Sequence, residues 1–303
     1  MRNIGKAFAP SFIPFIPSFK CSSSLRSSGF NGVGACLIRG VSCIAEIEVS
    51  RCTKLDFIYG DKQLNLPWIE NAVKAILNQT DISGVRGELL FNFELPLCAS
   101  LSIPTSALVS SLVSIYSALN LEIPPLTIGD IAHEMELKHK IGVGVSGLLL
   151  NGGLIIVKRT GIPSNAEYFK INYPNDLRII VAGRPLEIID LPKYDFKEIM
   201  SSHLMSRAQY SLDGVISFND LINKIKQFNF SHERIYSIGI RRILNELRKY
   251  SPLLCGVDFD GKTLFAVTYR DKIDIITNIL LDFFPCEGIF ISEIDPIGVR
   301  VYY

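Results

Sequence analysis

A chain of 303 residues is long enough for one large domain or for two lobes that share an interface. Apolar residues make up 48% of the sequence and charged residues 20%, which is the composition of a globular protein and excludes the disordered and fibrous classes. The 31 basic and 30 acidic residues nearly cancel and form no basic block, so we expect no nucleic-acid partner.

The seven cysteines indicate a reducing compartment. They are odd in number and scattered, they form no CxxC pair, and no histidine lies at a zinc-ligand spacing from any of them. We therefore expect reduced, mostly buried thiols in a soluble cytoplasmic protein.

Two apolar stretches could be mistaken for a secretory leader or a membrane-spanning helix. Residues 1–20 resemble a secretory leader, but Pro10, Pro14 and Pro17 interrupt the apolar run. Residues 95–121 carry no charge, but prolines divide them, and the helical remainder is too short for a bilayer core of roughly 30 Å. We expect no membrane association, and the second stretch predicts a helix buried inside the protein.

The first half of the chain mixes predicted strands with predicted helices. In chain order these are a strand over 41–50, a helix over 68–78, a strand over 88–93, helices over 105–120 and 127–140, and strands over 154–158 and 178–182. The helix over 105–120 carries an apolar stripe beside a stripe of serines, which let a neighbouring backbone come close, so we expect it at the centre of its lobe. Thr127 is the predicted N-cap of the next helix.

The second half has a different order of elements. It predicts helices over 217–228 and 231–250, the latter capped by Ser231, strands over 253–259 and 263–269 around the hairpin signal Asp260-Gly261, a helix over 273–283 and a strand over 289–294. This order predicts an α+β lobe with an antiparallel sheet. Pro185 and Pro192 bracket a connecting stretch, so we place the two lobes at residues 1–185 and 186–303.

The loop before the helix over 105–120 has the features of a phosphate site. A strand leads into a proline-led loop of small residues, and the loop enters the N-terminus of a helix, where unpaired N–H groups and a partial positive charge attract anions. This segment resembles the ATP loop of the GHMP kinases, which include galactokinase, homoserine kinase and mevalonate kinase. It reads Leu95-Pro96-Leu97-Cys98-Ala99-Ser100-Leu101-Ser102-Ile103-Pro104-Thr105-Ser106-Ala107.

Within that superfamily the chain is most similar to the archaeal pantoate kinases. The matching stretches keep their order and spacing over essentially the whole chain, and they are Ala9-Pro10, Gly32-Val33-Gly34-Ala35-Cys36-Leu37, Arg39-Gly40-Val41, Ile131-Ala132-His133-Glu134-Met135-Glu136, Gly142-Val143-Gly144, Gly152-Gly153-Leu154-Ile155-Ile156 and Ile294-Asp295-Pro296-Ile297-Gly298-Val299-Arg300. The resemblance implies the two-lobed GHMP-kinase fold of class α+β, with an N-terminal mixed α/β lobe and a C-terminal antiparallel-sheet lobe. It also implies ATP- and Mg²⁺-dependent phosphorylation of pantoate to 4-phosphopantoate, a step in archaeal coenzyme A biosynthesis.

The resemblance further assigns roles to residues of this chain. The implied nucleotide-binding positions are Ser100, Ser102, Thr105 and Ser106, and those on the pantoate side are Gly142, Gly144 and Ser146. Glu136 matches a family glutamate that could hold Mg²⁺ through oxygen ligation, with Glu134 as the fallback, and the alternative for both is a solvated helix face. ATP and pantoate are the implied partners, and a homodimer is an open alternative to a monomer.

The sequence departs from the family where the chemistry would be done. The family's loop glycines correspond here to Cys98, Ser100 and Ser102, whose Cβ atoms restrict the backbone. Pro104 stands where a serine is usual, and proline has no N–H to donate to a phosphate oxygen. Val145 falls at the family's aspartate, which is thought to assist the attacking hydroxyl, and valine cannot accept a proton.

Further departures lie near the N-terminus, where Ser11-Phe12 replaces the family's Gly-His and Asn31 replaces an arginine. Two interpretations therefore stay open. The first is an active pantoate-kinase-type enzyme, because phosphoryl transfer depends mainly on positioning and on charge neutralisation by Mg²⁺. The second is a non-catalytic relative that binds a ligand or a partner without turnover. No residue is assigned as catalytic.

Overall fold

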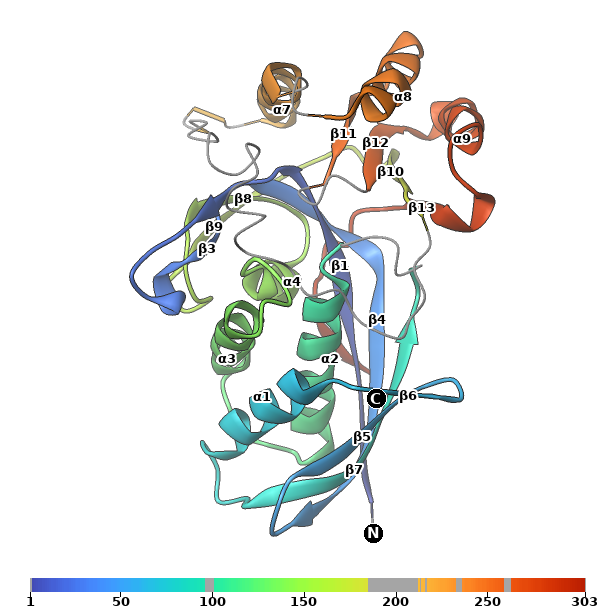
Figure 1. Cartoon of the computed structure of the whole chain (residues 1–303). Helices are drawn as coiled ribbons and strands as arrows, with labels where there is room; N and C mark the ends of the chain where they lie inside the picture. Colours follow the sequence, from blue (N-terminus) through green and yellow to red (C-terminus); the bar gives the residue numbers. More distant parts are fainter. Residues whose placement is uncertain are drawn as a thin grey trace.

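The structure is a computed structural model that describes residues 2–95, 101–184, 212, 214–215, 217–232, 236–258 and 263–302. Two main sheets, each with helices packed on it, account for most of these residues (Figure 1). The larger sheet has the strand order β14-β1-β4-β7-β5-β6, and β8 pairs with β4 and with β9. Its strands are β1 (Asn3–Ile16), β4 (Val33–Ser50), β5 (Lys54–Tyr59), β6 (Lys62–Leu64), β7 (Gly84–Phe93), β8 (Leu154–Arg159), β9 (Glu167–Ile171) and β14 (Arg300–Tyr302).

Strand β4 lies at the centre of the larger sheet. It pairs with β1 along one edge, and it is long enough to pair with both β8 and β7 along the other. Its first residues pair antiparallel with β8, with Val33 opposite Ile156, and its residues from Val41 onward pair with β7. Over residues 41–48 its buried side chains alternate with half-buried ones, as expected for a strand with one face on the core. The strand predicted over residues 41–50 is confirmed, and it begins earlier than predicted.

Helices α1 (Pro67–Leu77), α2 (Ile103–Ala118), α3 (Pro125–Lys138) and α4 (Ser146–Asn151) lie on one side of this sheet (Figure 1). Helix α2 packs directly on β1 and β4, and every residue from Ile103 to Ile115 is buried. Its approach to β1 is close: a Cβ built on Gly5 would lie 2.1 Å from the carbonyl oxygen of Ser114. The central helix with a small-residue face is therefore confirmed, and the glycine at position 5 allows the contact.

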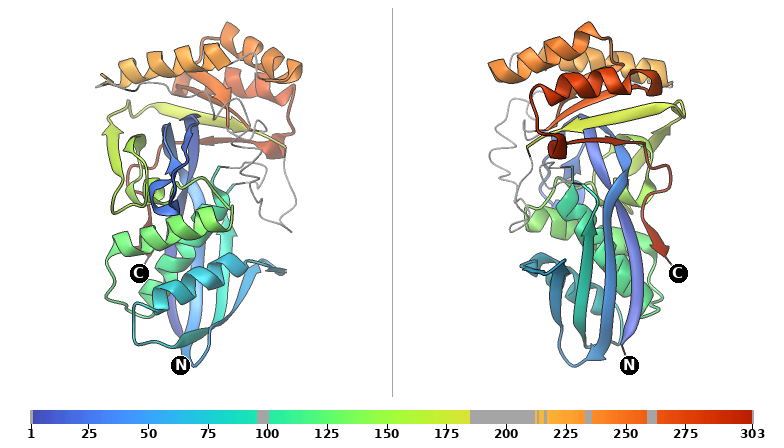
Figure 2. Two further views of the ribbon diagram at one scale, coloured as in Figure 1. Left: turned by 60° about the vertical axis from the view of Figure 1, so that its left-hand side comes forward. Right: turned by 90° about the vertical axis from the view of Figure 1, so that its right-hand side faces the viewer.

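The second main sheet has the order β11-β12-β10-β13, with antiparallel pairing throughout. Its elements are β10 (Leu177–Ala182), α7 (Phe218–His232), α8 (Ile238–Lys249), β11 (Leu254–Val257), β12 (Leu264–Tyr269), α9 (Ile273–Leu281) and β13 (Ile289–Ser292). Helices α8 and α9 cover the face turned away from the larger sheet (Figure 2). The opposite face joins the main core, where the rings of Phe265 and Phe15 lie 5.2 Å apart.

Short elements complete the described chain. Strands β2 (Phe19–Lys20) and β3 (Gly29–Phe30) pair with each other, and the 3₁₀ turns are η1 (Leu25–Ser27), η3 (Arg270–Lys272) and η4 (Cys286–Gly288). No helix in the described part of the chain has both the length and the apolar character needed to cross a membrane.

Two predicted helix starts are wrong. Ser231 lies inside α7, which ends at His232, and α8 begins at Ile238 with Ser237 as its cap, because the Ser237 side chain accepts a hydrogen bond from the N–H of Ile240. Helix α3 begins at Pro125 rather than after Thr127, because a proline in the first turn loses no hydrogen bond. The Asp260-Gly261 turn lies outside the described residues, although β11 and β12 pair antiparallel on either side of it.

The two sheets are not divided by one cut in the sequence. Strand β10, which precedes residue 185, belongs to the four-stranded sheet, and β14 at the end of the chain pairs with β1 in the larger sheet. The division into lobes 1–185 and 186–303 stays a prediction, and residues 185–211 lie outside the described ones.

Candidate active site

Two hydrogen bonds hold the start of α2 against β1, and a third closes its first turn. The N–H of Phe12 donates to the carbonyl oxygen of Leu101 at 3.0 Å. The Ser106 hydroxyl lies 2.7 Å from the carbonyl oxygen of Pro10 and 3.1 Å from that of Ser102. Ser102 adopts a left-handed backbone, with φ of 58°, which is uncommon for a residue with a side chain. The Ser106 hydroxyl therefore already has partners within the protein.

The other predicted nucleotide positions differ in their surroundings. Ser100 lies outside the described residues, and Ser102 is buried at the helix start. Pro104 occupies the first turn of α2 and lacks an N–H, so among the described residues Ile103 and Thr105 carry the backbone donors of this turn that have no partner within the helix. Thr105 is fully buried, and its hydroxyl has no hydrogen-bond partner in the described part of the protein.

Glu136 projects from α3 into the interior, where no part of it is exposed. Its Oε1 accepts from the N–H groups of Gly144 at 2.8 Å and Val145 at 3.0 Å, and its Oε2 accepts from Val145 at 3.0 Å and Ser146 at 3.2 Å. These donors belong to the turn before α4 and to its first residue, so the carboxylate caps that helix. Glu136 does not lie on a solvated helix face.

Burial also changes the proton affinity of this carboxyl group. Desolvation raises the pKa of Glu136 to about 7, against the opposing effect of the three N–H groups and of the nearby Thr105 hydroxyl. The neighbouring Tyr168 phenol is half-buried, and desolvation together with the charge of Glu136 raises its pKa.

Thr105, Glu136 and Gly142 meet at one point. A Cβ built on Gly142 would lie 2.2 Å from Glu136 Oε1 and 2.5 Å from Thr105 Oγ1, so only glycine fits between these two oxygens. Mg²⁺ prefers oxygen ligands and commonly takes one or two from the protein and the rest from phosphates and water. A carboxylate beside an unpartnered buried hydroxyl supplies such oxygens, so the residues present fit Mg²⁺. The described residues contain no group of three or more His, Cys, Asp or Glu side chains that could hold a metal.

Val145, at the position of the family's aspartate, is fully buried in the main core. Phe12 is also fully buried, and its ring packs edge-on against Phe30 with the centroids 5.3 Å apart. Two positions where the resemblance leads one to expect polar side chains are thus filled by apolar ones.

The remaining predicted positions lie around the same turn. The Ser146 hydroxyl donates to the carbonyl oxygen of Gly129 at 3.3 Å. Gly144 has φ of 81°, and a Cβ there would lie 2.8 Å from Cε1 of His133. Glu134 points away from this group and forms an ion pair with Arg26. The structure therefore brings Gly142, Gly144 and Ser146 together with Glu136 but leaves Glu134 apart.

His133, which the sequence placed in a family-like stretch without a role, also lies beside this turn. Its side chain is buried, and its Nε2 lies 2.9 Å from the carbonyl oxygen of Ser28, which fits the neutral ring donating its proton there. Desolvation lowers the pKa of His133. The sequence spacing of His133 carries no signal for this contact, because Ser28 lies 105 residues away.

The arrangement described above is the GHMP-kinase fold. Solved structures with this fold superpose on nearly the whole chain: a phosphotransferase related to the coenzyme A biosynthesis pathway has a TM-score of 0.81 at 18% identity, with 99% of this chain and 98% of that chain covered. Homoserine kinase from Cytophaga hutchinsonii has a TM-score of 0.72 at 16% identity, with 100% and 98% covered. Mevalonate diphosphate decarboxylase from Staphylococcus aureus has a TM-score of 0.71 at 15% identity, with 100% and 99% covered.

In sequence, the chain is 24% identical to the pantoate kinase of Methanospirillum hungatei over 225 residues, which are 70% of this chain and 72% of that protein. No protein-family model matches the chain. The predicted resemblance and the predicted α+β GHMP-kinase fold are both confirmed.

Proposed function

We propose that this protein is an ATP-dependent phosphotransferase that phosphorylates the hydroxyl group of a small acid in the cytoplasm, with pantoate as the first candidate and 4-phosphopantoate as its product. The observation that carries the proposal is the adjacent pair of Thr105 Oγ1 and the Glu136 carboxylate at the start of α2. The pantoate kinase relative supports the choice of acceptor.

In the proposed reaction the oxygen of the acceptor hydroxyl bonds to the γ-phosphorus of ATP and its proton passes to solvent, while the bond between the γ-phosphorus and the bridging β-phosphate oxygen breaks and ADP leaves. Thr105 and Glu136 would hold Mg²⁺, which neutralises phosphate charge when bound. The free N–H groups of Ile103 and Thr105 would donate to phosphate oxygens, and the turn over residues 142–146 would face the acceptor. Since Val145 cannot accept the hydroxyl proton, we expect turnover about 10²–10⁴-fold below that of an enzyme with a positioned base.

A second candidate function is ligand or partner binding without turnover. The observation that favours it is the burial of apolar side chains at Val145 and Phe12, together with the capping role of Glu136. Under this proposal the carboxylate stabilises α4 and binds no metal.

The test measures ATP consumption by the purified protein with pantoate and Mg²⁺, and uses pantothenate and homoserine as control acceptors. Thr105→Val removes the unpartnered hydroxyl while keeping the shape of the side chain, and Thr105→Ser restores the hydroxyl. We expect the valine variant to bind Mg²⁺–ATP roughly tenfold to a hundredfold more weakly, because a hydrogen bond or ligand contact to a charged group is lost. We expect the serine variant to bind as the wild type does.

Pantoate-dependent ADP release that Thr105→Val reduces would support the kinase. Binding of ATP without turnover on any acceptor would favour the second candidate. Equal ATP affinity in the wild type and Thr105→Val would place the nucleotide elsewhere and contradict the assignment of this site.

A further inference from the structure

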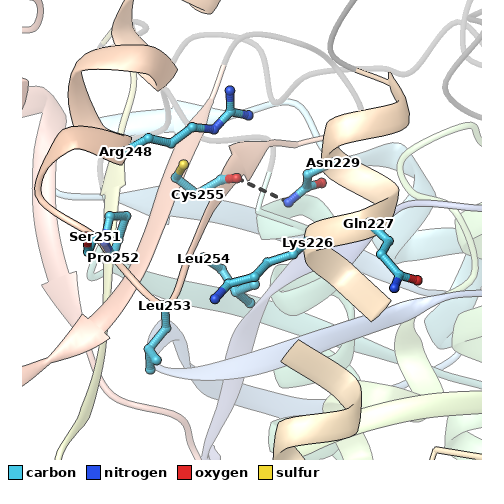
Figure 3. Close-up of a pocket in the computed structure, with 9 residues that line it drawn as sticks. All are labelled: Lys226, Gln227, Asn229, Arg248, Ser251, Pro252, Leu253, Leu254 and Cys255. Carbon is cyan, nitrogen blue, oxygen red and sulfur yellow. Dashed lines mark hydrogen bonds between the residues drawn. The ribbon is translucent and has the colours of Figure 1, made fainter. Parts of the chain in front are cut away.

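A hollow of about 470 Å³ lies in the C-terminal part of the molecule, between α7, the end of α8 and β11 (Figure 3). Its lining comes from the elements packed on the four-stranded sheet, and it includes none of the residues of the candidate active site. Pockets for small ligands commonly have volumes of roughly 300–1,000 Å³ and are mostly apolar with a few polar groups at defined places. The size of this hollow is in that range.

The walls of the hollow are fixed by hydrogen bonds on both sides. On the α7 side, Asn229 is 6% exposed, and its Nδ2 donates to the carbonyl oxygen of Cys255 on β11 at 3.1 Å. On the α8 side, Lys272 Nζ donates to the carbonyl oxygen of Ser251 at 3.2 Å, next to the left-handed backbone of that residue, with φ of 51°. Because hydrogen bonds already fix the residues around the hollow, little conformational entropy is lost when a ligand binds, and this favours affinity.

The floor of the hollow is apolar and its rim is cationic. The half-buried Pro252 and Leu253 and the buried Leu254 form the apolar part. Figure 3 shows Lys226 extending from α7 toward Leu254 and Arg248 extending from α8 above Cys255, so that two cationic side chains from different helices border one space. Arg248 Nη1 also donates to Asn245 Oδ1 at 3.1 Å. The described residues that line the hollow include no carboxylate.

Helices α7 and α8 carry more basic than acidic residues. The basic residues of α7 and α8 are Lys224, Lys226, Arg241, Arg242, Arg248 and Lys249, whereas their acidic residues are Asp220 and Glu246. The whole chain carries a formal charge of only +1, so this local excess is not a general property of the surface. A local excess of one sign raises the concentration of counter-charged ligands near it.

We propose that this hollow binds a small amphipathic anion: an apolar body the size of two fused rings that carries one carboxylate or phosphate group. The apolar body would cover Pro252 and Leu253, and the anionic group would lie between Lys226 and Arg248. This site is separate from the candidate active site, and the proposal does not depend on the proposed function.

The test uses 2-naphthoate, 1-naphthyl phosphate and the neutral 2-naphthamide, titrated into the full-length protein by calorimetry. We expect saturable binding of at least one anion with a Kd below about 1 mM, and binding of the amide at least tenfold weaker. Lys226→Met and Arg248→Met each keep an apolar stem and remove a charge, and we expect each to weaken anion binding roughly tenfold. The two anions distinguish a carboxylate from a phosphate ligand.

Lys249→Met is the matched control, because Lys249 is exposed on α8, is paired with Glu246 and does not line the hollow. We expect it to leave anion binding unchanged, and we expect excess ATP with Mg²⁺ not to displace the anions. Melting temperatures check that each variant is folded. Absence of saturable binding by both anions, equal binding of the amide, equal loss in Lys249→Met, or displacement by ATP would each overturn the proposal.

Discussion

Val145 shows how strongly one side chain depends on its neighbours. It is fully buried, and its N–H donates to both oxygens of Glu136. A carboxylate at this position would be buried beside an existing carboxylate, where neither charge has a cationic partner. We therefore expect Val145→Asp to lose about 2–5 kcal/mol of unfolding free energy and to gain no turnover. Thermal unfolding and pantoate-dependent ADP release measure the two effects.

Val145→Asn is the matched variant for this prediction, because it has the shape of aspartate without the charge. We expect it to be less destabilised than Val145→Asp, and the difference to shrink at low pH, where the carboxyl groups are protonated. A folded Val145→Asp protein with raised turnover would contradict the prediction and would indicate a site that lacks only its base.

The carboxyl group of Glu136 predicts a dependence of stability on pH. Its pKa is about 7 in the folded protein, above the ordinary value of 4.5. Between these two values the folded state holds a proton that the unfolded state has released, so stability falls as pH rises through this range and levels off above about pH 7. The slope from this one group is at most about 1.4 kcal/mol per pH unit.

Glu136→Gln removes the titrating group and is the comparison for this prediction. Chemical unfolding from pH 4.5 to 7.5 in the presence of EDTA, which removes divalent cations, measures the free energy of unfolding of both proteins. We expect the wild type to lose stability relative to the variant as pH rises. Parallel pH profiles would show that Glu136 does not titrate in this range.

The turn between α3 and α4 is the element on which the candidate site depends. It passes so close to α2 and α3 that Gly142 separates Thr105 Oγ1 from Glu136 Oε1. We expect Gly142→Ala to destabilise the protein by more than about 1 kcal/mol and to weaken Mg²⁺–ATP binding, because the added methyl group must displace these oxygens. Urea unfolding and nucleotide titration measure the two effects.

Gly239→Ala on α8 is a suitable control, because a Cβ there would meet only Ser237 Oγ at 4.0 Å. Alanine is the better helix former, so we expect a change between zero and about 1 kcal/mol in the stabilising direction. If both alanine variants behaved alike, the close approach at Gly142 would have no energetic consequence.

At the scale of the whole molecule, the end of the chain ties the two sheets together. Asp295 is 1% exposed, its N–H donates to the carbonyl oxygen of Cys36 at 2.8 Å, and its carboxylate lies 2.6 Å from Arg300 Nη1. The guanidinium of Arg300 also lies 4.2 Å from the ring centroid of Phe8 on β1. Asp295 lies between β13 of one sheet and β14 of the other, and Arg300 is the first residue of β14.

We expect Arg300→Met to reduce the free energy of unfolding by about 3 kcal/mol, because it leaves a buried carboxylate without its charge partner. The control is Arg2→Met, which breaks an exposed pair with Glu88 and is expected to cost less than about 1 kcal/mol. Denaturant midpoints with unchanged slopes provide the measurement. Equal costs in the two variants would show that the buried position of Asp295 adds nothing.

Much of the fold was predictable because its signals are local. Apolar periodicity predicts helix α1 from its own segment, and apolar, β-branched composition predicts strands β8, β10, β11 and β12 in the same way. The start of α8 could not be predicted, because serine is a favourable N-cap at both position 231 and position 237. In the structure Ser231 is part of α7 and Ser237 caps α8. Strand β14 is too short to show a periodic pattern. It lies at the opposite end of the chain from β1, so its pairing with β1 has no local signal in the sequence.

The sequence by itself determined the GHMP-kinase fold class, the central position of α2 and the list of residues around a candidate phosphate site. The fold class and the list of site residues follow from the family resemblance, which rests on motifs that keep their order along the chain, and the central position of α2 follows from its apolar and serine stripes. Only the tertiary structure decided that Glu136 is buried and caps α4 and that Glu134 pairs with Arg26 instead. It also decided that the hydroxyl of Thr105 has no partner among the described residues, while that of Ser106 is bonded to β1. The physical reason is that burial and hydrogen bonding at this site depend on contacts between α2, α3 and the turn over residues 142–146. These segments are separate in the sequence, so the residue spacing within one of them does not predict the contacts.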